Sequence, residues 1–260
     1  MSADPGGTAA WLRRYHDAEA GAVRLLCLPH AGGSASYFFG LSRRLAPAVR
    51  TLAVQYPGRQ DRRTEPPAGS VAELADGVVA ALAAQADDDR AGPLVLFGHS
   101  LGAIVAFEAA RRLEGAGGTG PAALILSGRR APSRSAPETL HLRDDAGVLA
   151  ELQQLGGTEE RVLGDEDLVK MILPAVRADY RALAAYVEEW DEAASQPVGC
   201  PIVVMVGDSD PVAPVPDALA WERFTTGGFE SEVFPGGHFY LSGDAEPVVE
   251  SIRRVLKTYA

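Results

Sequence analysis

The sequence predicts an α/β protein with a mostly parallel central sheet and helices on both faces. Short apolar runs rich in Val, Leu and Ile alternate along the chain with longer segments of helical periodicity, which is the pattern of such a sheet. The chain has 260 residues, of which 47% are hydrophobic, so it can bury a substantial core.

The apolar runs predict the strands, and the segments between them predict the helices. Strands are expected at "VRLLCLP" (23–29), "RTLAVQ" (50–55), "PLVLFG" (93–98), "AALILSG" (122–128), "PIVVMVG" (201–207) and "ESEVFP" (230–235). Helices are expected at about 36–46, 70–86, 101–114, 214–226 and 245–257.

Residues 133–196 interrupt this alternation. The segment has helical patterns but no strand-like run, and it is much longer than the dozen or so residues that a crossover needs. We therefore expect a core formed by residues 1–132 and 197–260, with residues 133–196 inserted as a helical lid. Two packing helices without a role at the site are the alternative.

The composition excludes several classes of protein. A net charge of −11 and a pI near 4.9 argue against a nucleic-acid-binding protein or one that binds anionic membranes. No signal core or membrane span is evident, so a cytoplasmic protein is expected. Cys27 and Cys200 lie in apolar runs and are expected to be reduced and buried. No metal-ligand cluster, phosphate-binding loop or dinucleotide motif is present, so no cofactor or metal is expected.

The pentapeptide "GHSLG" places Ser100 between a strand and a helix. It fits the G-x-S-x-G pattern, in which a serine sits on a tight strand-to-helix turn that needs small flanking residues, here Gly98 and Gly102. At that point the Ser100 hydroxyl would lie at a helix N-terminus, where negative charge is favoured. A simple N-cap serine would explain the hydroxyl but not both glycines. Ser100 is the predicted nucleophile.

A serine nucleophile needs a base, and His238 is the predicted one. It follows the last expected strand in "FPGGHFYL", at the carboxyl edge of the sheet. The other histidines fit less well, because His16 precedes the first strand, His99 lies inside the turn, and His30 and His141 lie in the first loop and in the insertion.

The residue that orients the histidine is predicted in "GDSDPVAP". Asp210 is favoured over Asp208, because its spacing from Gly207 puts it past the turn, but the choice stays open. The order Ser100, Asp210, His238 is the order of α/β-hydrolases. Backbone amides of Leu101 and of Ala31, in the loop "PHAGGSAS", are expected to form the oxyanion hole. The same loop could be only a tight turn.

Several segments together resemble one family, the type II thioesterases that accompany modular polyketide and nonribosomal peptide synthases. The resemblance is carried by "LPHAGGSASYF" (28–38), "VQYPGRQDRRTEPP" (54–67), "FGHSLGAIVAFE" (97–108), "LQQLGGT" (152–158), "ILPAVRADYRALAAY" (172–186), "GDSDPVAP" (207–214) and "FPGGHFYL" (234–241). It implies an editing enzyme that hydrolyses stalled or wrong acyl groups from the phosphopantetheine arm of acyl or peptidyl carrier domains. It also implies a mobile lid over an acyl chamber.

Carrier domains are generally acidic, so this acidic chain would need a local basic surface to meet them. Such a surface could be formed by Arg43, Arg44, Arg59, Arg62, Arg63, Arg129, Arg130 and Arg134, although an ordinary solvated face is the alternative. A free-standing esterase, a product-releasing terminal thioesterase and a non-catalytic binding protein remain the other functional hypotheses.

Overall fold

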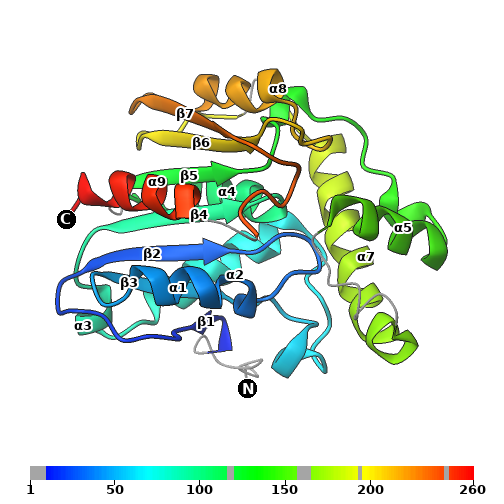
Figure 1. Cartoon of the computed structure of the whole chain (residues 1–260), viewed down its shortest axis with the longest axis horizontal. Coiled ribbons are helices and arrows are strands. Elements are labelled where there is room, and N and C mark those ends of the chain that lie inside the picture. The colour runs from blue at the N-terminus through cyan, green and yellow to red at the C-terminus, as the bar shows by residue number, and fades with distance from the viewer. Residues whose placement is uncertain (1–9, 116–119, 157–164, 193–194, 243–245) are drawn as a thin grey trace.

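The computed structural model describes residues 10–115, 120–156, 165–192, 195–242 and 246–260. In this part of the chain a seven-stranded sheet has the order β1-β3-β2-β4-β5-β6-β7 (Figure 1). The edge strand β1 runs antiparallel to β3, and the other pairs are parallel. The strands are β1 (Leu12–Arg13), β2 (Val23–Leu28), β3 (Val49–Val54), β4 (Leu94–His99), β5 (Ala123–Ser127), β6 (Ile202–Gly207) and β7 (Phe229–Phe234).

The six predicted strands are confirmed, each end lying within one residue of its expected place. The sequence did not predict β1, because a strand of two residues is too short to form a recognisable apolar run. The helices of the core are α1 (Phe39–Leu45), α2 (Val71–Ala83), α3 (Asp87–Arg90), α4 (Leu101–Gly115), α8 (Val215–Leu219) and α9 (Glu246–Lys257). Short 3₁₀ helices at Ala35–Phe38 and Ala220–Phe224 complete the predicted segments 36–46 and 214–226. Residue 245, where the last predicted helix begins, lies outside the described residues.

Each face of the sheet is covered by its own set of helices. On β2, Leu26 and Leu28 belong to the core shared with α2 and α4, whereas Leu25 and Cys27 belong to the core shared with α1 and α9. This division follows from the alternation of side chains along a strand. Both layers are visible in Figure 1.

The segment 133–196 forms helices at the carboxyl ends of the parallel strands, as Figure 1 shows. They are α5 (Asp145–Leu155) and α7 (Glu166–Glu188), with a 3₁₀ turn at Leu140–Leu142 before them. The carboxylates of Asp144 and Asp165 accept backbone N–H bonds at the starts of α5 and α7, so ordinary N-caps fix where these helices begin. Residues 157–164 and 193–194 of the predicted lid lie outside the described part.

The order of the strands determines where a site can form. Strand β2 lies between β3 and β4. The chain therefore passes from β2 to β3 on one side and then crosses back to β4 on the other side of β2. At such a reversal the loops beyond the carboxyl ends of the two strands diverge and leave a crevice. The loop after β2 and the turn after β4 flank this crevice.

Candidate active site

Ser100 occupies a strained turn between β4 and α4. Its φ is 55°, a left-handed conformation that residues other than glycine rarely adopt, and its amide donates to the carbonyl of Ser127 at 2.8 Å. A Cβ on Gly98 would lie 2.1 Å from the carbonyl oxygen of Gly102, and a Cβ on Gly102 would lie 2.0 Å from that of Leu28. Both glycines are therefore required for the close packing of β2, β4 and α4 at this turn.

His238 and Asp210 meet at the carboxyl edge of the sheet. Nδ1 of His238 lies 2.9 Å from Oδ2 of Asp210, and the two side chains are 3% and 0% exposed. The other carboxylate oxygen, Oδ1, accepts the amides of Val212 and Ala213 at 2.8 and 3.1 Å. Because a carboxylate only accepts, Nδ1 of His238 is the donor and Nε2 carries the free lone pair.

Asp208, the alternative to Asp210, points elsewhere. It is exposed, and its Oδ1 accepts from the hydroxyl of Ser209 at 2.7 Å and from the amide of Gly236 at 3.0 Å. These two hydrogen bonds lower the pKa of Asp208, with the Ser209 bond as the larger cause. Its side chain thus ties the turn after β6 to the loop after β7, and only Asp210 reaches His238.

A cavity of about 570 Å³ brings Ser100 and His238 together. Ala31 also lines it, and the amide of Leu101 stands at the N-terminus of α4, where a helical N–H has no partner within the helix. No hydrogen bond joins Ser100 to His238 in the described structure. Free hydrolases often show this looser arrangement.

The walls of the cavity differ in chemistry. Its polar side consists of His30, Ser34, Ser36, Tyr37 and Ser242 around the loop after β2. A second part of the lining is mostly apolar and comes from α5 and α7, which contribute Leu152, Leu155, Ile172, Val176 and Tyr180. The cavity can therefore hold an apolar chain against the helices and polar groups against the loop.

Two further histidines surround His238. The ring centroid of His99 lies 5.0 Å from that of His238 and 6.0 Å from that of His30. Burial, followed by the nearby charges of His238 and Arg59, lowers the pKa of His30 to about 3. Burial also lowers the pKa of His99 well below its usual range, and Nδ1 of His99 pairs with Ser127 Oγ at 2.9 Å. Both rings are neutral near pH 7.

The sequence did not indicate how His99 is held. Ser127 Oγ lies between His99 and the hydroxyl of Tyr240, 2.7 Å from the latter, so a buried chain of hydrogen bonds fixes this ring. Ser127 ends β5 and Tyr240 follows β7. Only the pairing of distant strands brings them together, and no motif in the sequence signals it.

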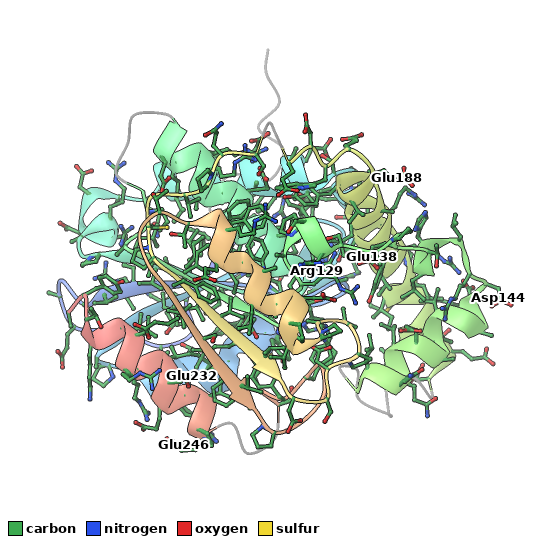
Figure 2. All side chains as sticks on the ribbon, turned by 90° about the horizontal axis from the view of Figure 1, so that it is seen from above. Arg129, Glu138, Asp144, Glu188, Glu232 and Glu246 are labelled. Atoms are coloured by element: carbon green, nitrogen blue, oxygen red, sulfur yellow. The ribbon has the colours of Figure 1, made fainter. Side chains whose placement is uncertain are left out.

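The prediction of a basic surface is wrong for three of the eight arginines. Arg59, Arg62 and Arg129 are buried and form ion pairs with Asp179, Glu65 and Glu138. Figure 2 shows Arg129 beside Glu138, in the segment that leads toward α5. Arg43, Arg63 and Arg134 remain exposed. These arginines can be buried because each guanidinium group pairs with a carboxylate.

Three further predictions of the sequence concern metal ligands, membrane spans and cysteines. No group of three or more His, Cys, Asp or Glu side chains is arranged there to hold a metal ion. None of the described helices is long and apolar enough to cross a membrane. Cys27 and Cys200 are free and buried, although Cys200 precedes β6 rather than lying in it.

The strand order, the strained serine after β4 and the histidine after β7 define an α/β-hydrolase. A family model described as "Thioesterase domain" matches residues 23–256, and the chain belongs to this thioesterase family. It is therefore an enzyme that hydrolyses thioesters.

Relatives that are named as thioesterases agree with this assignment. Thioesterase PikA5 of Streptomyces venezuelae is 49% identical over 242 residues, which cover 93% of this chain and 84% of PikA5. Among solved structures, the type II thioesterase BorB from the borrelidin biosynthetic cluster is 44% identical with a TM-score of 0.84, covering 95% of this chain and 98% of BorB. RedJ, the thioesterase of the prodiginine pathway in Streptomyces coelicolor, is 33% identical with a TM-score of 0.81, covering 93% of this chain and 88% of RedJ.

Proposed function

We propose that this thioesterase removes stalled or aberrant acyl groups from the phosphopantetheine arm of acyl or peptidyl carrier domains. The observation that carries the proposal is the cavity that Ser100 and His238 line together with apolar residues of α5 and α7. The likeness of the chain to YbtT, a type II thioesterase from the yersiniabactin NRPS/PKS biosynthetic pathway, supports a carrier-bound substrate.

The proposed catalytic steps use these residues as follows. His238 Nε2 takes the proton of Ser100 as the Ser100 oxygen attacks the thioester carbonyl, and the amides of Leu101 and Ala31 stabilise the oxyanion. The C–S bond then breaks, and the imidazolium returns the proton to the departing thiolate. Water, deprotonated by His238, hydrolyses the acyl-serine ester and releases the carboxylic acid. Asp210 fixes the ring through Nδ1 and stabilises its protonated form.

Residues 133–196 act in this proposal as a lid on a core of residues 1–132 and 197–260. Their helices α5 and α7 cover the carboxyl ends of the strands and supply the apolar wall (Figure 1). A chain held against this wall would lose contact with water on the side that faces the helices. That arrangement suits an enzyme that accepts acyl groups of varied structure.

The test is hydrolysis of acetyl, butyryl and octanoyl groups loaded on a purified carrier domain. The wild type should release all three as free acids, whereas Ser100→Ala should lose at least about 1000-fold in kcat, because the acyl-enzyme cannot form. Ser231→Ala is the matched control, since Ser231 is an exposed serine of the edge strand β7 and does not line the cavity.

Two results would contradict the proposal. Equal rates for Ser100→Ala and wild type would remove the nucleophile. A preference for small oxygen esters over carrier-bound thioesters by more than about tenfold, or 1.4 kcal/mol in transition-state binding, would indicate an esterase instead.

A further inference from the structure

Arg59 and Asp179 form a buried ion pair between two segments that are far apart in the sequence. Arg59 follows β3 and Asp179 lies in the middle of α7. Nη1 and Nη2 of Arg59 donate to Oδ2 and Oδ1 of Asp179 at 2.7 and 2.9 Å, and the two side chains are 5% and 1% exposed. Burying either charge alone would be costly, whereas this two-point geometry satisfies both.

The pair also binds the backbone of the loop after β2, residues 30–36, which we call the oxyanion loop. Oδ2 of Asp179 accepts from the amide of Gly32 at 2.7 Å, and Nη1 of Arg59 donates to the carbonyl of Gly33 at 3.2 Å. The peptide groups directly after Ala31 are therefore held by side chains from two other elements.

Two more contacts complete this support. Gln55, at the end of β3, accepts from the amide of Ala35 at 3.0 Å and donates to the carbonyl of Arg59 at 3.1 Å. At Gly32, where φ is +73°, a Cβ would lie 2.5 Å from Cγ2 of Val176, so α7 packs directly on the loop. The amide of Ala31, by contrast, has no intramolecular hydrogen bond in the described structure, which leaves it free for a ligand.

We propose that Arg59 and Asp179 are positioning residues for thioester hydrolysis. They hold the oxyanion loop so that the amide of Ala31 faces the carbonyl oxygen of the substrate. Because Asp179 lies on α7, this geometry exists only while α7 is seated on the loop. The inference rests on the proposed function, since it takes the Ala31 amide to be an oxyanion donor.

The position of α7 gives the pair a second consequence. Ile172, Val176 and Tyr180 lie on the same helix as Asp179 and form part of the apolar wall of the cavity. The helix that contacts the acyl chain is thus the helix that holds the oxyanion loop. An acyl group that packs against α7 should therefore hold this helix on the oxyanion loop and so complete the oxyanion hole.

The decisive variant is the double substitution Arg59→Met with Asp179→Leu. Replacing a buried ion pair by apolar residues of similar size often leaves stability unchanged, so folding and positioning can be separated. With an octanoyl N-acetylcysteamine thioester, kcat should fall about 100-fold and KM should change less than about threefold, as for a displaced oxyanion donor. The affinity for an alkylboronic acid, which forms a tetrahedral adduct with the serine, should fall by the same factor as kcat/KM.

The matched control is Arg112→Met with Asp76→Leu, which removes an ion pair between α4 and α2 that does not line the cavity. It should keep kcat and boronic acid affinity within about twofold. A purely structural role for Arg59 and Asp179 would instead lower the melting temperature and leave both quantities unchanged for the folded enzyme.

The inference is overturned if the folded double variant keeps wild-type kcat and boronic acid affinity. Should the double variant fail to fold, Arg59→Lys retains the charge without the two-point contact, and wild-type kcat in that variant would equally overturn it. The proposed function is tested separately, because it fails only if Ser100→Ala keeps the wild-type rate of thioester hydrolysis or if oxygen esters are preferred. An inactive Ser100→Ala beside a fully active double variant would remove only the positioning role.

Discussion

At the scale of single residues, the environment of each side chain decides its role in this site. His30, His99 and His238 lie within one cluster, but only His238 faces a carboxylate. Burial without such a partner lowers the pKa of His30 and His99 and keeps them neutral. One residue type therefore supplies a candidate base and two neutral supports.

The two aspartates after β6 allow a sharp test at this scale. Asp210→Asn should lower kcat by about 1000-fold or more, because an amide cannot stabilise the imidazolium and can favour the wrong tautomer. Asp208→Asn is the matched control, since Asp208 accepts from Ser209 and Gly236 and does not reach His238, and its kcat should stay within about threefold. Steady-state rates with an acyl thioester distinguish the two variants. Similar losses in both would show that the Asp210–His238 contact is not the productive one.

The sequence predicted the residues of the candidate site but not the contacts that support them. The turn at Ser100 was recognisable because the glycines on both sides follow from steric demands of the backbone. Asp208 and Asp210 could not be separated, because two residues in one turn differ only in where the fold directs them. The sequence predicted Arg59 to lie on the surface, because its carboxylate partner Asp179 is 120 positions away and cannot be recognised from the local sequence.

At the scale of elements, α7 links the cavity to the oxyanion loop. It is 23 residues long, and it presents Ile172, Val176 and Tyr180 to the cavity and Asp179 to Arg59. Pro174 within it removes one backbone hydrogen bond, and its side chain is exposed. The helical pattern of this segment was evident in the sequence, whereas the face turned toward the sheet was not.

The wall that α7 provides should control which acyl chains are accepted. Ile172→Trp adds volume inside the cavity and should lower kcat/KM for octanoyl thioesters by about tenfold, with a smaller effect on acetyl thioesters. Met171→Trp, one position earlier and 54% exposed, is the control and should leave the ratio of the two substrates unchanged. Competition assays with both thioesters measure that ratio. An equal loss for both chain lengths would place the acyl group elsewhere.

At the scale of the whole molecule, the buried neutral histidines couple folding to pH. The pKa of His30 is about 3 in the folded protein and about 6.5 in an unfolded chain. Between these values the unfolded state binds one more proton, so stability falls as the pH drops below about 6.5 and stops falling near pH 3. The slope for one such group is about 1.4 kcal/mol per pH unit.

Urea unfolding between pH 4.5 and 7 measures this coupling. His30→Asn should reduce the slope of stability against pH by about one proton's contribution. Tyr37→Phe is the control, because Tyr37 packs against His30 with ring centroids 4.7 Å apart, and burial raises its own pKa to about 12, well outside this range. An unchanged slope of stability against pH in His30→Asn would mean that His30 has the same pKa in the folded and unfolded states.

The amino-acid sequence by itself determined the order of the strands along the chain, the turn that presents Ser100 and the place of His238 after the last strand. These features depend on local hydrophobic patterns and on backbone sterics, which neighbouring residues fix. The tertiary structure decided that Asp210 meets His238, that His99 is held by Ser127 and Tyr240, and that Arg59 pairs with Asp179. These contacts join residues from separate elements, and only the packing of the sheet and its helices brings such residues within hydrogen-bonding distance.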